Sequence, residues 1–478
     1  MSNFVKTLSL ILLIIINSIG SATTYHVKND GDDASSGTSW KTAFKTILHS
    51  LDVSETGDEI WVKEGIYKEG KTIDSGGVSL YGGFAGTETD LSQRNFRGHQ
   101  TAIDGEDSYQ CIRNSGLCDG FHIVNGYNED GAGVDNTGIV QNCFIYNNVS
   151  IWGGGGVEND NITSSCVIYN NSAWGGGGIY NRAFGKVEHC IVFGNTAECG
   201  GGIYNDSGII QNSVIRGNSI YDTGGGEWNR AGGIWQQNGI IHNCLIYDNT
   251  GRNCGGICNK RGYVINCTVY SNSSDEYGGI ANTGVVYNCI SWNNQYCDIM
   301  NETYTHTGSI HISCFGEANP DDNDNIRTNP QFVNTSGDPS TWDFHLKNGS
   351  ACIDRGRDVA FSGIPDLFPE YFTPEMDIEG RERPGSDNKI CMGAYESPDY
   401  YEPSLLSIPT KRFYVSKNGN NMDGSSWENA FTSITMALSR ASGGEMYEIW
   451  VKEGIYNEKS ALIIPGMVNL IGGFAGNE

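Results

Sequence analysis

The middle of the chain repeats itself with a period near 23 residues. Seven successive units place a Cys, or once a Ser, at an equivalent position, with spacings of 23, 24, 23, 31, 23 and 22 residues. These residues are Cys143, Cys166, Cys190, Ser213, Cys244, Cys267 and Cys289. Five residues after each of them stands an Asn, at Asn148, Asn171, Asn195, Asn218, Asn249, Asn272 and Asn294. Such a fixed short period is the signature of units that stack on one another.

Two further columns keep the same register. A Gly followed by Val or Ile recurs in each unit, and two residues after that aliphatic residue comes a polar amide: Asn136, Asn159, Asn181, Asn205, Gln236, Asn259 and Asn282. The apolar pieces are short, β-branched and bounded by Gly, Asn or Ser, which is typical of strands and turns. We therefore predict an all-β fold, a right-handed single-stranded parallel β-helix with capping segments and coils about 4.8 Å apart.

Stacking places equivalent residues of successive coils above one another. We expect the Asn column to hydrogen-bond along its own stack, and the Cys column to point inward as small apolar thiols. Disulfides between neighbouring coils are sterically conceivable, but Ser213 within the column favours free thiols. Better candidates for pairing lie off the column, at Cys199, Cys254, Cys258 and Cys297, and Cys352 could pair with Cys391.

The two flanks of the chain are duplicates. Residues 60–67 and 449–456 share the sequence IWVKEGIY, and GGFAG occurs at both 82–86 and 472–476. A β-helix needs such a cap because an open coil end exposes strand edges and apolar core. We expect a signal peptide over 1–22, an N-terminal cap with first coils over 23–99, repeats over 100–315, a C-terminal segment over 316–397, a linker over 398–411 and a truncated second cap over 412–478.

The repeat also carries a family resemblance. The unit NCxIYxN followed by GGGIYN, as in Cys190 to Asn205, resembles the repeats of polymorphic outer membrane proteins and pectate-lyase-like β-helices over roughly residues 100–315. Residues 326–396, with NPQFV, DFHL, RPG and MGAYE, resemble the C-terminal segment of secreted bacterial proteins of the choice-of-anchor Q type. The resemblance implies a fold and a place at the bacterial surface, but no particular activity.

The first residues look like an export signal. Lys6 precedes an apolar run from Leu8 to Ile16 and a small-residue cleavage site at 20–22. No later stretch is apolar over about 18 residues, so we expect no transmembrane segment in the mature chain. The net charge of −26 argues against nucleic acid as a partner. We expect a protein that is secreted or displayed on the outer surface of a bacterium.

The irregular coil is the best place to look for catalysis. The 31-residue step from Ser213 to Cys244 leaves a protruding loop near 221–230. Asp222 and Glu227 could serve as acid and base, Arg230 could hold an anionic substrate, and Trp228 could stack on a sugar. The plainer interpretation is a solvated glycine-rich loop.

Trp152 and Trp174 fall at equivalent places in adjacent coils and should lie side by side. If they are exposed, they form a carbohydrate-binding track; if they are buried, they are part of the packing, which is the interpretation we favour. Tyr180 and Tyr204 raise the same question beside the Gly step.

The acidic stretch with Asp321, Asp322 and Asp324 offers oxygen ligands for Ca²⁺. It lacks the Gly turn and distal Glu of an EF-hand, so a solvated loop is the preferred interpretation. The sequence calls for no other cofactor.

No catalytic motif emerges from the coils. The leading hypothesis is a secreted or cell-surface β-helix acting in display, adhesion or glycan binding, with a polysaccharide or cell-surface glycan as partner. The alternative is a polysaccharide lyase or glycoside hydrolase with its site near 221–230, which rests on fold analogy.

Overall fold

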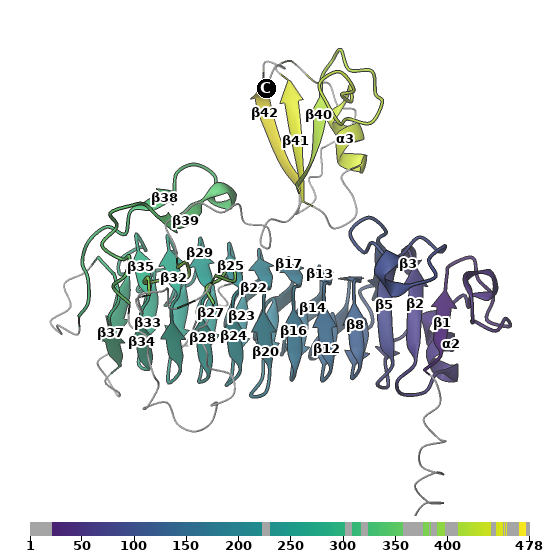
Figure 1. Ribbon diagram of the computed structural model, residues 1–478, viewed down its shortest axis with the longest axis horizontal. Coiled ribbons are helices and arrows are strands. Elements are labelled where there is room, and N and C mark those ends of the chain that lie inside the picture. Colours follow the sequence, from purple (N-terminus) through teal and green to yellow (C-terminus); the bar gives the residue numbers. More distant parts are fainter. Residues whose placement is uncertain are drawn as a thin grey trace, which may run out of the picture.

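The computed structural model shows a long right-handed coil of short parallel strands (Figure 1), which confirms the predicted parallel β-helix. The structure describes residues 22–221, 230–301, 308–316, 324–356, 376–381, 383, 390–396, 410–440, 446–452, 454, 456 and 468–474. The predicted signal peptide lies outside the described residues except for Ala22.

Four parallel sheets make the walls of the coil. Sheet A contains β1 Thr24–Val27, β2 Glu59–Lys63, β5 Ser79–Phe84, β8 Leu117–Asp119, β12 Ile139–Gln141, β16 Ile162–Ser164, β20 Lys186–Glu188, β24 Ile209–Gln211, β28 Ile240–His242, β31 Tyr263–Ile265, β34 Val285–Tyr287 and β37 Ser309–His311. Sheet B contains β3 Gly65–Tyr67, β6 Thr101–Asp104, β9 His122–Val124, β13 Phe144–Tyr146, β17 Val167–Tyr169, β21 Ile191–Phe193, β25 Val214–Arg216, β29 Leu245–Tyr247, β32 Thr268–Tyr270 and β35 Ile290–Trp292. Sheet C contains β4 Ile73–Asp74, β7 Ile112–Asn114, β11 Val134–Asn136, β15 Val157–Asn159, β19 Ile179–Asn181, β23 Ile203–Asn205, β27 Ile234–Gln236, β30 Ile257–Asn259, β33 Ile280–Asn282 and β36 Ile299–Asn301. The short sheet D contains β10 Tyr127–Asn128, β14 Val149–Ser150, β18 Ser172–Ala173, β22 Thr196–Ala197 and β26 Ser219–Ile220.

From β7 to β37, strands pair with their equivalents one coil away without a shift in register, whereas a bulge interrupts the pairing of β2 with β5. Ile145, for example, lies between Ile123 and Ile168, and all three are fully buried. Inward Ile, Val and Cys side chains of successive coils fill one continuous core. The corner between sheets A and B requires a left-handed backbone: Asn142, Ser165 and His189 all have φ of 53°. Asn tolerates this conformation better than most residues, which explains its abundance at the corners.

Two buried amide ladders run along the coil, as the sequence predicts. In the first ladder, Nδ2 of Asn136, Asn159 and Asn181 each donates to the amide oxygen of the next coil at 2.8 Å. In the second, the Asn171 side chain accepts from the backbone and side chain of Asn148 and donates to Asn195. The ladders satisfy polar groups that the narrow coil buries at its corners.

All fifteen cysteines are buried, and none of them forms a disulfide. The column from Cys143 to Cys289 points into the core. The pairing expected at Cys199, Cys254, Cys258 and Cys297, and that of Cys352 with Cys391, is wrong for this structure. These thiols are instead packed in the interior, because a neutral Cys side chain behaves as a small apolar group.

The C-terminal segment folds back over the outer face of sheet B. Its hairpin, β38 Phe332–Asn334 and β39 Asp343–Leu346, is antiparallel. Phe332 and Phe344 pack with Tyr247 and Tyr270 of the coil. Hydrogen bonds such as that from the Ala394 N–H to Thr268 Oγ1 at 3.0 Å fix it there.

The second cap repeats the first in structure as well as in sequence. It contains three parallel strands, β40 Thr410–Val415, β41 Met446–Lys452 and β42 Val468–Phe474, which correspond to β1, β2 and β5. Its helix, α3 Ile434–Arg440, corresponds to α2 Ile47–Val53 of the first cap. Val27 and Val415 even form the same isolated bridge, to Phe44 and Phe431. The remaining helical turns are the 3₁₀ segments η1 Trp40–Thr42, η2 Leu91–Gln93 and η3 Pro339–Thr341. Within the described residues, no helix is long and apolar enough to cross a membrane. The predicted domain boundaries stay predictions.

Candidate functional site

The outer face of sheet C carries a row of large or charged side chains. From β7 to β33, each strand of this sheet contributes one outward residue, flanked by a buried aliphatic residue and a buried amide. Successive coils present Arg113, Asp135, Glu158, Tyr180, Tyr204 and Trp235. With Trp152 and Trp174 on the turns leading into this sheet, we call this row the track.

Trp152 and Trp174 are exposed, so the packing interpretation favoured from the sequence is wrong for them. Their side chains are 56% and 39% exposed, and their rings meet edge to face with centroids 6.4 Å apart. The Gly175 N–H donates to the Trp152 carbonyl at 2.8 Å, so the two turns are stacked like the strands. Two indoles held next to each other at the surface, inclined at 64° to one another, offer exposed apolar ring area to a ligand.

The tyrosines beside them form a stack. The rings of Tyr180 and Tyr204 are 4.5 Å apart, and Trp235 continues the stack 4.2 Å from Tyr204. Tyr180 and Tyr204 are half-buried, whereas Trp235 is buried. The Tyr180 ring also lies against Gly175, next in the chain to Trp174. Packing and exposure therefore combine here: Tyr180 and Tyr204 stack on one another and both stay partly exposed.

A cluster of carboxylates lies at the other end of the track. Glu158 is buried, and its Oε1 accepts from Arg182 Nε at 2.6 Å. Its Oε2 accepts from the Gly154 backbone N–H at 2.7 Å. Arg182 also approaches Asp160 at 3.6 Å and lies 5.5 Å from the Tyr180 ring centre. Glu158 thus ties the turn that carries Trp152 to the Tyr180 strand.

Burial raises the pKa of Glu158 to about 7, outweighing the opposing effects of Arg182 and the Gly154 N–H, and Asp130 adds to the rise. Burial likewise raises the pKa of Asp135, although Arg113 opposes it. A carboxyl that titrates near neutrality within a surface site is a candidate proton donor.

The backbone makes room for this cluster at Gly153. A Cβ there would lie 2.1 Å from Glu158 Oε2 and 2.8 Å from Asp130 Oδ1. Any larger residue would push the two carboxylates apart, so the close approach requires glycine.

The candidate loop is only partly described. Asp222, Glu227 and Trp228 lie outside the described residues, and the structure places only its flanks, Tyr221 and Arg230. Arg230 is buried, and its Nη2 pairs with Glu198 at 3.0 Å, so its guanidinium is enclosed rather than presented to a substrate. The catalytic role suggested for these residues stays a prediction.

The calcium candidates are not brought together by any described contact. Asp321 and Asp322 lie outside the described residues, and Asp324 is exposed. Among the residues that the structure describes, no group of three acidic, His or Cys side chains could hold a metal ion.

Sequence reasoning missed Glu158 and treated Arg182 as one of several scattered basic residues. The signal was present in the repeat itself: the residue between the Gly-aliphatic step and the amide column must point outward, because its two neighbours point inward. That variable column is the track.

No protein-family model matches this chain, and no curated protein does either. Solved structures with a similar overall shape include the pectate lyase Pel9A, at 15% identity over 79% of this chain and 97% of its own, with a TM-score of 0.49. XylC in complex with xylose is 10% identical over 78% of this chain and 98% of its own, with a TM-score of 0.42. A rhamnogalacturonan lyase is 14% identical over 61% and 87%, with a TM-score of 0.32. At these identities the likeness concerns the fold alone.

Proposed function

We propose that this protein binds a polysaccharide along the track on the outer face of sheet C. The observation that carries the proposal is the exposed Trp152–Trp174 pair, which continues into the Tyr180–Tyr204 stack. Sugar rings bind proteins by placing an apolar face on an aromatic ring and their hydroxyls on nearby polar groups. The carboxylates and guanidinium beside the track supply those polar groups.

An exported, surface-exposed location belongs to the same proposal, as does the kinship of residues 326–396 with choice-of-anchor Q proteins. Such a location would bring the track into contact with extracellular glycans. Adhesion or display would then follow from glycan binding itself.

The test is binding to a panel of immobilised plant, algal and bacterial polysaccharides. The double variant Trp152→Ala/Trp174→Ala should weaken binding at least ~10-fold, because a central aromatic anchor contributes about 2 kcal/mol. The matched control is Phe184→Ala, since Phe184 is 87% exposed on the turn between β19 and β20. Binding that survives loss of both indoles, or that falls equally in the control, would refute the track.

Hydrolysis of the bound glycan is a second candidate. It is favoured by Glu158, whose pKa of about 7 suits a general acid. Both of its oxygens are engaged, so Arg182 would have to move away during catalysis. Release of new reducing ends, abolished by Glu158→Gln, would support this candidate; abolition by Glu227→Gln instead would place the chemistry on the loop at 221–230.

A further inference from the structure

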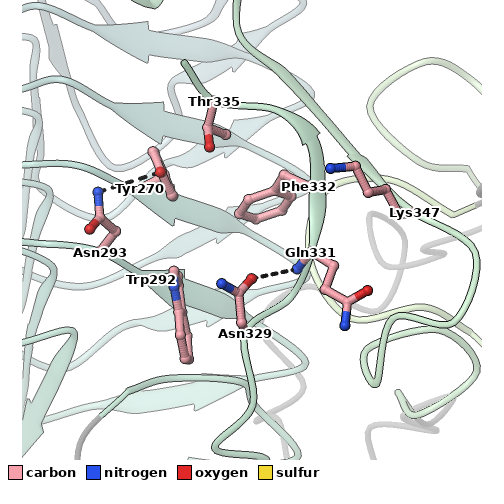
Figure 2. A pocket seen from close by; sticks show the side chains of 8 residues that line it. All are labelled: Tyr270, Trp292, Asn293, Asn329, Gln331, Phe332, Thr335 and Lys347. Carbon is pink, nitrogen blue, oxygen red and sulfur yellow. Dashed lines mark hydrogen bonds between the residues drawn. The ribbon is translucent and has the colours of Figure 1, made fainter.

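A second concave site lies far along the coil, between sheet B and the C-terminal segment. Its volume is about 370 Å³, in the lower part of the roughly 300–1,000 Å³ range of small-molecule sites. Figure 2 shows side chains from both walls around this space. The residues of this end pocket are Tyr270, Trp292, Asn293, Asn329, Gln331, Phe332, Thr335 and Lys347.

The two walls come from parts of the chain that are unrelated in sequence. Tyr270 of β32 and Trp292 of β35 are register partners on the outer face of sheet B. Opposite them lies the segment around β38, with Lys347 directly after β39. The track is on a different sheet, so this pocket and the proposed function do not depend on each other.

The lining is chemically selective. Its described lining residues offer three amide side chains, two hydroxyls and an indole ring, and none of them is a carboxylate. Lys347 is exposed and makes no ion pair with any described residue. In a chain with a net charge of −26, an ammonium group at a pocket that forms no ion pair with a described residue marks a preference for an anion.

The pocket is also held in shape before any ligand arrives. Tyr270 and Phe332 meet edge to face with centroids 5.6 Å apart, and Asn293 Nδ2 donates to the Tyr270 hydroxyl at 3.4 Å. Gln331 has a φ of +57°, a conformation that few residues other than Gly adopt. The Gln331 N–H donates to Asn329 Oδ1 at 2.8 Å, and the Gln331 carbonyl accepts the Lys347 N–H at 2.9 Å.

We propose that the end pocket binds a uronic acid residue of an acidic polysaccharide. The Trp292 ring would take the apolar face of the sugar, the amides would bind its hydroxyls, and Lys347 would pair with its carboxylate. A Lys–carboxylate contact is a charge-assisted hydrogen bond, about twice as strong as a neutral one. The pocket therefore selects acidic over neutral sugars of the same size.

The experiment titrates the full chain with sodium galacturonate and sodium glucuronate, and with galactose and glucose as neutral counterparts. Binding is followed by saturation-transfer NMR and calorimetry. At least one uronate should bind ~10-fold more tightly than its neutral counterpart, with an advantage that shrinks as salt rises. Lys347→Met should remove that advantage, and Lys347→Arg should retain most of it. Lys45→Met, at an exposed Lys of the first cap, is the matched control and should change nothing.

Three results would overturn the proposal. The first is the absence of saturable binding by either uronate. The second is an unchanged preference in Lys347→Met. The third is a uronate preference that disappears in Trp152→Ala/Trp174→Ala but persists in Lys347→Met, which would assign the anion to the track. Since none of these readouts uses a polymer, failure here leaves the polysaccharide-binding test of the track intact.

Discussion

The second amide ladder allows a sharp test of what holds the coils together. Asn171 is 2% exposed and makes four hydrogen bonds with its side chain. Its Oδ1 accepts from the Asn148 N–H at 3.0 Å and from Asn148 Nδ2 at 2.9 Å. Its Nδ2 donates to the Ile145 carbonyl at 2.9 Å and to Asn195 Oδ1 at 3.0 Å. Asn171→Ala removes all four.

The losses are unequal. Asn148 Nδ2 keeps its bond to the Ile123 carbonyl, and Asn195 Oδ1 still accepts the backbone N–H of residue 171. The Asn148 N–H keeps no partner, and a buried unsatisfied donor costs about 1–3 kcal/mol. With about 1 kcal/mol for each of the three other bonds, Asn171→Ala should lower the free energy of unfolding by about 4–6 kcal/mol. That is a large share of the ~5–15 kcal/mol by which ordinary domains are stable.

The assay is guanidinium denaturation followed by far-UV circular dichroism, with the shift in midpoint converted through a shared slope. The control is Asn161→Ala, because Asn161 lies on an exposed turn and its side chain makes a single contact, to the Thr137 carbonyl at 3.3 Å. It should change stability by no more than about 0.5 kcal/mol. If Asn171→Ala is no more destabilising than this control, the ladder does not stabilise the coil and the reasoning fails.

Two further predictions concern other parts of the molecule. The fifteen buried thiols should react with a thiol reagent only as the chain unfolds, and rapid reaction of several thiols in the native state would contradict the buried column. Cys166→Ser should lower the free energy of unfolding by no more than about 1.5 kcal/mol, because Ser213 occupies the same column with its Oγ donating to the Gln211 carbonyl. Burial alone would lower the pKa of His345, but Asp343 and Glu379 outweigh it and raise this pKa to about 9. The stabilisation from this imidazolium should thus be complete below about pH 6.5 and be lost as the pH rises through 9; urea midpoints of the wild type and His345→Gln that stay parallel from pH 6.5 to 9.5 would contradict it.

The sequence by itself determined the coil. Columns of Cys, Asn and Gly-aliphatic pairs can keep one register over seven units only if equivalent residues stack, so the parallel strands, the amide ladders and the inward thiols all followed from spacing. The duplicated cap was equally visible, because EIWVK of β2 recurs in β41 and GGF of β5 recurs in β42.

Only the tertiary structure decided which surfaces are open. Trp152 and Trp174 occupy equivalent positions whether exposed or buried, and exposure depends on which parts of the chain fold over each face. The C-terminal segment covers part of the outer face of sheet B and leaves the turns beside sheet C uncovered at these two residues. The Glu158–Arg182 pair joins residues 24 positions apart, and the end pocket joins Tyr270 and Trp292 to Lys347, which no repeat relates. Spacing within a repeat specifies contacts between equivalent positions, whereas contacts between the coil and a non-repeating segment depend on how the two surfaces fit together.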